Sequence, residues 1–287
     1  MKGFTIGVIG GSGIYEMDGI EILGEKFIDT PYGAPSSEVL LASIKGKRVA
    51  FLPRHGKGHR FNPTEVNYRA NIFAMKKVGV KKLISVSAVG SLKEELEPRH
   101  FVLPNQIIDR TKLRPGTLYD GMAVHVGFAD PFCDGLAGEI EKRAREMPIT
   151  VHRGGTYVCM EGPLFSTKAE SELYRSWGAS IIGMTAIPEA KLAREAEMCY
   201  STIALVTDYD VWKDEHVSVD AVIAVLKDNS ANAKTLLKKV IQDLDADADC
   251  PCHSALENAI MTSPDLISAE TRTKLEPLLG KYLPVDE

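Results

Sequence analysis

Residues 155–212 read GTYVCMEGPLFSTKAESELYRSWGASIIGMTAIPEAKLAREAEMCYSTIALVTDYDVW and indicate the fold more clearly than any other stretch. Residues 156–160 form a β-prone run that ends at a Gly-Pro turn, and residues 179–184 and 198–206 are apolar runs of strand length. Helical patterns separate these three runs. The order strand, helix, strand, helix, strand is typical of an α/β sheet, in which ligands bind at the carboxyl ends of the strands.

Cap signals mark the starts of the two intervening helices. Thr167 and Glu170 have the spacing of a capping box, in which each side chain binds the other residue's backbone N–H. Pro188 and Glu189 suit a first helical turn, because proline lacks an N–H and glutamate favours the positive helix end. The three strand ends would bring to one sheet edge the side chains of Glu161, Phe165, Met184, Thr185, Asp208 and Asp210.

The flanking segments continue the same alternation. Further strands are predicted over 5–9, 38–44, 48–52, 82–86, 100–108 and 149–152, and further helices over 64–77, 135–147, from 219 onward, and over 269–279. Residues 109–134 read as a long loop, which in a compact domain is a flap or an interface. We predict a single domain over residues 1–287, with its core over about 1–243 and a C-terminal segment over 244–287.

The composition narrows the possible functions. Hydrophobic residues make up 44% of the chain, enough for a large core, and the formal net charge of -5 argues against general nucleic-acid binding. No window is apolar and long enough to cross a bilayer, and the first residues lead into a strand rather than a signal peptide. We therefore expect a cytoplasmic protein without a nucleic-acid or membrane partner.

The five cysteines do not form the pattern of a secreted disulfide framework. Cys133, Cys159 and Cys199 lie in or beside apolar runs and are expected to be buried thiols. Cys250 and Cys252 follow an acidic tract over 243–249, in a turn that the composition predicts to be exposed. These two could form a disulfide or remain free thiols.

Three predicted strand ends expose groups that can bind an anion. The first strand runs into Gly10-Gly11-Ser12-Gly13, whose N–H groups and hydroxyl can approach a phosphate. Dinucleotide binding is disfavoured there, because the position for a third glycine holds Glu16. Arg54 offers a planar fork that suits phosphate. The phosphate-binding candidates at the three strand ends are Ser12, Arg54, His55, Ser87 and Ala88.

The basic loop after the strand 48–52 also contains two histidines. His55 and His59 are four residues apart, a spacing that on a helix could place both on one metal ion. Gly56 and Gly58 make a helix improbable here, and no accompanying Glu-x-x-His context supports a metal. We expect no metal ion.

A phosphate site beside hydroxyls and carboxylates suits phosphorolysis of a nucleoside. Phosphate attacks the anomeric carbon of the sugar through an oxocarbenium-like state while the purine leaves. A carboxylic acid that stays protonated beside the base can donate to N7 as negative charge builds there. Asp208 fits this role because it ends an apolar strand, and its alternative role is that of a turn or cap residue.

An ordered set of motifs resembles those of the methylthioadenosine phosphorylases in the trimeric purine nucleoside phosphorylase family. The motifs are GVIGGSG, PRHGKGH, NPTEVNYRANI, SAVGSL, YDG, EGPLFST, MTAIPEA and TDYDVW, and the resemblance runs from about residue 5 to about residue 226. It implies a single α/β domain with a central mixed sheet, partly barrel-like and flanked by helices. It also implies conversion of 5'-methylthioadenosine to adenine and 5-methylthioribose 1-phosphate in purine and methionine salvage. Phosphate would be a co-substrate, and no cofactor would be needed.

The same resemblance implies roles for single residues. Thr185 would share the phosphate site, Met184 would contact the ribose, and Phe165 would pack near the sugar and base. His125 matches a histidine that enters the pocket of a neighbouring subunit, so a homotrimer, or a dimer of trimers, would complete each site. The residues at the N7 and 6-amino edge of the purine would be Asp208 and Asp210, with Ser166 and Thr207 nearby.

Specificity follows from the same positions. Asp208 favours adenine, because relatives that act on 6-oxopurines have asparagine there. Hydrocarbon at Val219, Val222 and Ile223 would surround the 5' substituent and suit methylthio better than hydroxyl, by on the order of 1 kcal/mol per methyl-sized contact. Gly183 departs from the family, whose members commonly have asparagine there. The alternatives are a broad-specificity or 6-oxopurine nucleoside phosphorylase and, more distantly, a non-catalytic nucleotide-binding protein.

Overall fold

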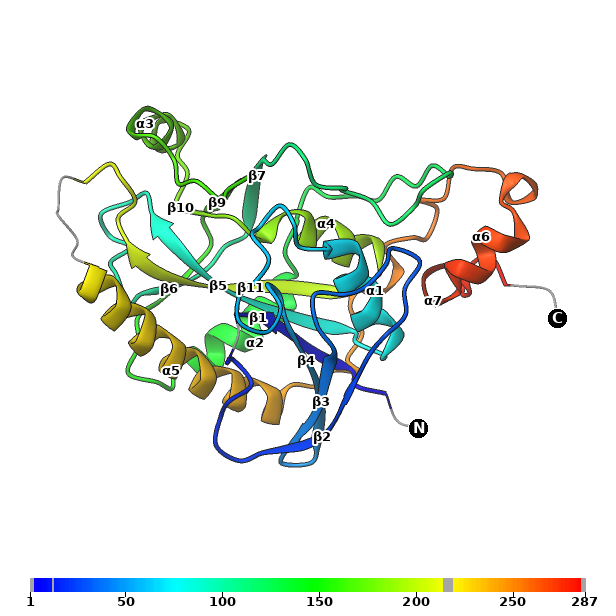
Figure 1. The fold of residues 1–287 in the computed structure, drawn as a ribbon, viewed down its shortest axis with the longest axis horizontal. Helices are drawn as coiled ribbons and strands as arrows, with labels where there is room; N and C mark the ends of the chain where they lie inside the picture. Colours follow the sequence, from blue (N-terminus) through cyan, green and yellow to red (C-terminus); the bar gives the residue numbers. More distant parts are fainter. Residues whose placement is uncertain (1–2, 12, 214–218, 285–287) are drawn as a thin grey trace.

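The computed structural model describes residues 3–11, 13–213 and 219–284, with only the backbone over 219–223. Its eleven strands form one mixed sheet with helices on both faces (Figure 1). The strands are β1 (Ile6–Gly10), β2 (Ile20–Lys26), β3 (Val39–Ile44), β4 (Lys47–Pro53), β5 (Lys82–Ser91), β6 (Phe101–Leu103), β7 (Gln106–Arg110), β8 (Val151–Arg153), β9 (Thr156–Met160), β10 (Ile181–Gly183) and β11 (Cys199–Asp208). The helices are α1 (Tyr68–Lys77), α2 (Asp134–Ala144), α3 (Lys168–Ser176), α4 (Ala186–Glu195), α5 (Val219–Asp243), α6 (Ala269–Lys274) and α7 (Glu276–Leu279).

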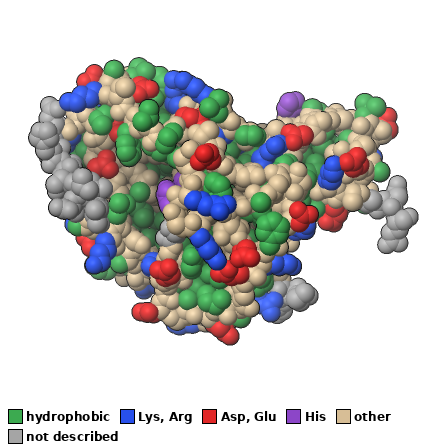
Figure 2. All heavy atoms as spheres, viewed as in Figure 1, with side chains coloured by type: hydrophobic (Ala, Val, Ile, Leu, Met, Phe, Trp, Pro, Cys, Tyr) green, Lys and Arg blue, Asp and Glu red, His purple; other side chains and the backbone are tan. Residues whose placement is uncertain are grey.

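The helices bury their apolar faces on opposite sides of the sheet. Phe73 of α1 and Leu192 of α4 belong to one core cluster, whereas Ile140 of α2 and Leu237 of α5 belong to the other. The short helices α6 and α7 form an arm beside α1, and Figure 2 shows acidic and basic side chains interspersed over the body and the arm. None of the described helices is both long enough and apolar enough to cross a membrane.

The predicted α/β class is confirmed, but the sheet is not closed. Its main path runs β2-β3-β4-β1-β5-β10-β9-β7, and a branch at β5 carries β11, β6 and β8. The single strand predicted over 100–108 was wrong, because Pro104 lacks a ladder N–H and separates β6 from β7. The edge strand β2 was not predicted.

The helix predicted from residue 64 begins later than expected. Asn62 and Glu65 do make the reciprocal bonds of a capping box, but they close a turn. Helix α1 itself starts at Tyr68, where Asn67 caps it by accepting from the Ala70 N–H at 3.2 Å. The capping box between Thr167 and Glu170 is confirmed at the start of α3.

Strand β5 positions the candidate site. Along one edge it pairs with β11 over most of its length. Along the other edge β1 pairs in parallel with residues 82–85, and β10 pairs antiparallel with Gly90 and Ser91. Within the described chain, residues 86–89 therefore have no strand partner on that edge. We call this gap the β5 opening; it begins just past the carboxyl end of β1, and α/β sheets bind ligands at the carboxyl ends of their strands.

Candidate active site

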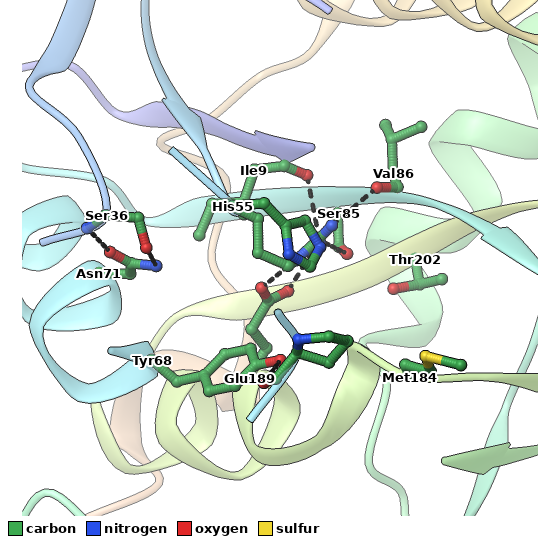
Figure 3. A network of polar contacts seen from close by, with 12 residues as sticks. Ile9, Ser36, His55, Tyr68, Asn71, Ser85, Val86, Met184, Glu189 and Thr202 are labelled. Carbon is green, nitrogen blue, oxygen red and sulfur yellow. Dashed lines mark hydrogen bonds and ion pairs between the residues drawn. The ribbon is translucent and has the colours of Figure 1, made fainter. Parts of the chain in front are cut away.

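Arg54 follows β4 and lies beside the β5 opening with only 1% of its surface exposed. Its Nε and Nη2 atoms bind the two carboxylate oxygens of Glu189 in α4, with Nη2 3.1 Å from Oε2 (Figure 3). Nη2 also donates to Ser85 Oγ at 2.7 Å and to the Ile9 carbonyl at 3.3 Å, and Nη1 donates to the Val86 carbonyl at 3.1 Å. The bidentate edge of the Arg54 guanidinium, formed by Nε and Nη2, therefore binds the carboxylate of Glu189 and is not available for phosphate. Nη1 has a second N–H without an acceptor among the described residues.

The partner of Arg54 is as buried as Arg54 itself. Glu189 is 0% exposed, and its Oε2 also accepts from the Tyr200 hydroxyl at 3.0 Å. Burial opposes the charge on Arg54, but the Glu189 carboxylate outweighs this effect and raises the pKa of the guanidinium. The pair thus keeps Arg54 charged and in one conformation. The remaining N–H of Nη1 therefore has a fixed direction before any ligand binds.

His55 is neutral at physiological pH. Its Nδ1 lies 2.9 Å from the Phe61 carbonyl, and because a carbonyl can only accept, Nδ1 carries the proton. Burial and the Arg54 charge lower the pKa of His55 to about 4. The Nε2 atom is then an acceptor, which suits a protonated phosphate oxygen. The His59 ring stacks on His55, with 4.2 Å between centroids.

Three buried hydroxyls lie together at the opening: Ser87 on β5, Tyr157 on β9 and Thr185 before α4. None of their oxygens has a hydrogen-bond partner within the described protein. Burial raises the pKa of Tyr157, and the nearby Ser87 and Thr185 hydroxyls partly offset this rise, so the three groups are close neighbours. Since buried polar groups are normally paired, three unpaired hydroxyls in one place indicate a site for a ligand rich in acceptors.

Gly183 leaves the space that the Tyr157 hydroxyl occupies among these three groups. A Cβ atom on Gly183 would lie 2.0 Å from the Tyr157 hydroxyl oxygen and 2.8 Å from Cζ. No side chain fits at 183 while the phenol is there. The hydroxyl of Tyr157 thus takes the volume that a larger residue at 183 would need.

Asp208 and Asp210 lie at the other end of the opening. Asp208 pairs with Gly90 of β5, and its two oxygens accept from the Thr207 hydroxyl at 2.6 Å and from the Asp210 N–H at 2.8 Å. Asp210 adopts a left-handed φ of 51°, and its buried Oδ2 has no partner among the described residues. Burial raises the pKa of Asp210, the Asp208 carboxylate adds to the rise, and the Ser171 hydroxyl opposes it.

The two carboxyl groups have different surroundings. Asp208 already accepts from two donors of the protein, whereas Asp210 has an unpaired oxygen and a pKa that burial raises. Strand β5 connects the two ends of the site. Val86, bonded to Arg54, and Gly90, paired with Asp208, are four residues apart, about 13 Å along β5.

Comparisons with known proteins show what this chain is similar to. Residues 5–242 match the model of the phosphorylase superfamily. S-methyl-5'-thioadenosine phosphorylase of Geobacter sulfurreducens is 55% identical over 283 residues, covering 97% of this chain and 99% of the relative. The chain belongs to the methylthioadenosine phosphorylase family. A member from an antarctic soil metagenomic library has a crystal structure with a TM-score of 0.92 and 46% identity, covering 96% of this chain and 98% of that one.

A more distant family member keeps the same fold. The methylthioadenosine phosphorylase of Schistosoma mansoni in complex with adenine is 34% identical, with a TM-score of 0.83, covering 90% of this chain and 97% of that chain. This chain therefore shares sequence and fold with both solved structures over most of the length of each chain.

In this family member Glu161 is an anchor rather than a site carboxylate. Burial alone would raise the pKa of Glu161, but bonds from the Lys112 and Leu113 N–H groups and from Thr64 and Arg114 lower it to about 2. The Arg114 side chain is 1% exposed and donates to the carbonyls of Met184 and Ile187 at 2.6 Å each. It therefore fixes the turn that presents Met184 and Thr185.

The predicted sugar and base contacts are less enclosed. Phe165 is 78% exposed, and its neighbour Leu164 is 84% exposed. Ser166 donates to the Met160 sulfur at 3.4 Å, and Met184 is half-buried. Ala88 is exposed on β5, where its N–H can reach a ligand.

One chain does not bring every predicted residue to the opening. His125 is exposed on the loop after β7, and its N–H donates to the Ala259 carbonyl at 2.9 Å. Figure 1 shows this loop reaching toward α6, on the side away from the tips of β5 and β11. Ser12 and the side chains of Val219, Val222 and Ile223 lie outside the described residues.

Sequence reasoning missed three residues of this family member's site. Glu189 was predicted only as a helix-start residue, Tyr157 as part of a strand, and Arg114 as part of a loop. Their partners lie far away in sequence: Arg54 and Glu189, for example, are 135 residues apart. The one indication in the sequence was Gly183, where family members commonly have asparagine before Met-Thr.

Proposed function

We propose that this chain catalyses phosphorolysis of 5'-methylthioadenosine to adenine and 5-methylthioribose 1-phosphate. The supporting observation is the β5 opening, where three unpaired hydroxyls and the fixed Arg54 lie at one end and two carboxyl groups lie at the other. The identity of 55% to an S-methyl-5'-thioadenosine phosphorylase makes this nucleoside the first substrate to test.

The phosphate end supplies the nucleophile. Nη1 of Arg54 and the hydroxyls donate to phosphate, and Nε2 of His55 accepts from its protonated oxygen. Because these groups are fixed in advance, little entropy is lost when phosphate is held in line with the anomeric carbon. The proposed phosphate ligands are Ser12, Arg54, His55, Ser87, Ala88 and Thr185, together with Tyr157.

The base end assists the leaving group. Adenine departs with negative charge building on N7, and a carboxylic acid there donates a proton. Asp210 is the acid with the raised pKa, and Asp208 accepts from the 6-amino group. Ser166 and Thr207 hold this edge, Phe165 and Met184 contact sugar and base, and Val219, Val222 and Ile223 surround the methylthio group.

The site is completed by a second copy of the chain, in a homotrimer or dimer of trimers. The exposed Phe165 and Leu164 need a cover, and the exposed His125 is a side chain that an adjacent subunit can supply. The enzyme acts in the cytoplasm, without a cofactor in the reaction, since phosphate is a co-substrate and not a resident group.

The test is release of adenine from a panel of nucleosides, with and without inorganic phosphate. We expect methylthioadenosine to be cleaved only with phosphate, faster than adenosine and far faster than inosine. Faster cleavage of inosine would instead support a 6-oxopurine phosphorylase. Nucleoside binding without any adenine release would support a non-catalytic binding protein.

A further inference from the structure

Four cysteines that are distant in sequence meet near the beginning of β11. The Sγ atoms of Cys133, Cys199, Cys250 and Cys252 all lie within 4.8 Å of one another, and those of Cys133 and Cys250 are 3.6 Å apart. Cys199 opens β11 and Asp208 ends it, so roughly 30 Å of strand separates this cluster from the base end of the active site. We call these four residues the thiol cluster.

The thiol cluster is part of the core. Cys133, Cys199 and Cys252 are 5%, 1% and 8% exposed, and Cys250 is half-buried. The sequence prediction of an exposed Cys-Pro-Cys turn was wrong, because the turn forms a 3-10 helix, Pro251–Ser254, that inserts Cys252 between α2 and β11. The fifth cysteine, Cys159, lies apart from the cluster and bonds to Ile187 instead.

The spacing of the sulfurs fits a tetrahedral metal ion. Zinc bound to four thiolates at about 2.3 Å sets its sulfurs roughly 3.8 Å apart, within the spread of the thiol cluster. A disulfide requires about 2.0 Å, so each sulfur pair would have to close much further. We propose that Cys133, Cys199, Cys250 and Cys252 bind one Zn²⁺ ion as a structural tetrathiolate site. Three chain segments build this proposed site, so no spacing in the sequence indicates it.

Zinc binding would require the four cysteines to lose their thiol protons. Zn²⁺ binds thiolates, so these protons would be released to solvent as the ion binds. The charge of a tetrathiolate would be offset by cations nearby.

Those cations are Lys81 and Lys82, at the start of the strand beside the thiol cluster. Lys82 of β5 pairs with Cys199 of β11, and the Lys81 carbonyl accepts from the Cys199 N–H at 2.9 Å. On the turn itself, His253 Nε2 lies 3.5 Å from Cys199 Sγ. Lys81 also pairs with the Asp247 carboxylate at 2.7 Å, so the acidic tract partly offsets its charge.

An entry path leads to the ion. A depression of about 400 Å³ is lined by Asp249, Cys250, Pro251, His253 and Ser254, and it leads from solvent to the half-buried Cys250. A bound ion would connect the start of α2, the start of β11 and the C-terminal segment. The Cys133 sulfur already accepts from the Leu136 N–H at 3.4 Å, so it also caps α2. The site would therefore fix the C-terminal segment to the body.

The test uses the full chain, purified with a reductant and without chelator. We expect about one zinc per chain by elemental analysis, retained after dialysis, and replacement by Co²⁺ should give the visible absorption of tetrahedral cobalt thiolate. Cys133→Ser and Cys252→Ser should each lose most of the metal. Cys159→Ser is the matched control and should keep it.

Two results would overturn the proposal. Thiol titration of the denatured, non-reduced protein could find one free thiol and a mass lower by four hydrogens, which means two disulfides. Alternatively, it could find all five thiols free with no zinc bound after incubation with Zn²⁺. Because wild-type metal content and the cobalt spectrum need no substitution, a serine variant that fails to fold does not decide the outcome.

Discussion

The two ends of the proposed site differ in how far a single chain encloses them. At the phosphate end Arg54 and Glu189 are buried and paired, and the hydroxyls around them are enclosed by one chain. At the base end Phe165 is 78% exposed. Phosphate is a small co-substrate of fixed shape, so a rigid, enclosed site can bind it without having to open. The nucleoside is larger and must enter and leave, so its end stays open until substrate or a second subunit covers it.

The largest effect is expected from Glu189→Ala, which breaks the rigid end. It leaves the Arg54 charge buried without its partner, so the free energy of unfolding should fall by about 3–5 kcal/mol and phosphorolysis should be nearly abolished. Urea denaturation and the steady-state rate measure the two effects. Tyr200→Phe, which removes one bond to Glu189, is the control and should cost only about 1 kcal/mol. Equal stability of the two variants would contradict the assignment.

Asp210→Asn tests the acid at the open end. We expect kcat to fall by about 10²–10⁴ with little change in KM for phosphate. In the unaltered protein the acid is protonated below its raised pKa, so kcat should fall as pH rises through that pKa, and this limb should vanish in the variant. Asp208→Ala should also cut turnover strongly. Asp228→Asn, which alters an exposed ion pair, should leave the pH profile unchanged.

Phe165→Ala should weaken nucleoside binding alone. Losing an aromatic contact with sugar and base should raise KM for methylthioadenosine about 10-fold, while KM for phosphate stays the same. Leu164→Ala alters the equally exposed neighbour and serves as the control for a general effect on this loop. A larger rise in KM for phosphate than for the nucleoside would mean that the two ends are not separate.

Tyr157→Phe should have the smallest effect, and on phosphate alone. Loss of one hydroxyl donor should raise KM for phosphate about 5-fold, equivalent to about 1 kcal/mol. Stability should not fall, because the hydroxyl has no partner in the described protein before phosphate binds. An unchanged KM for phosphate combined with lower stability would make the hydroxyl purely structural.

The sequence predicted local features well and long-range pairing poorly. The strand Thr156–Met160 and the capping box at Thr167 depend on neighbours a few residues away, and both were confirmed. The partnership of Arg54 with Glu189 depends on how α4 packs across the sheet, which no spacing reveals. The neutral state of His55 was hidden for the same reason, because its pKa follows from burial and not from its basic loop.

The contact between Tyr157 and Gly183 limits how this enzyme can change. A Cβ atom at 183 would lie 2.0 Å from the Tyr157 hydroxyl oxygen, so an asparagine introduced there collides with the phenol, whereas shortening the side chain at 157 first leaves an empty space beside Ser87 and Thr185. Either single step passes through a damaged intermediate, and only the double exchange restores a filled pocket. These two positions should therefore be varied as one unit in any library built on this chain.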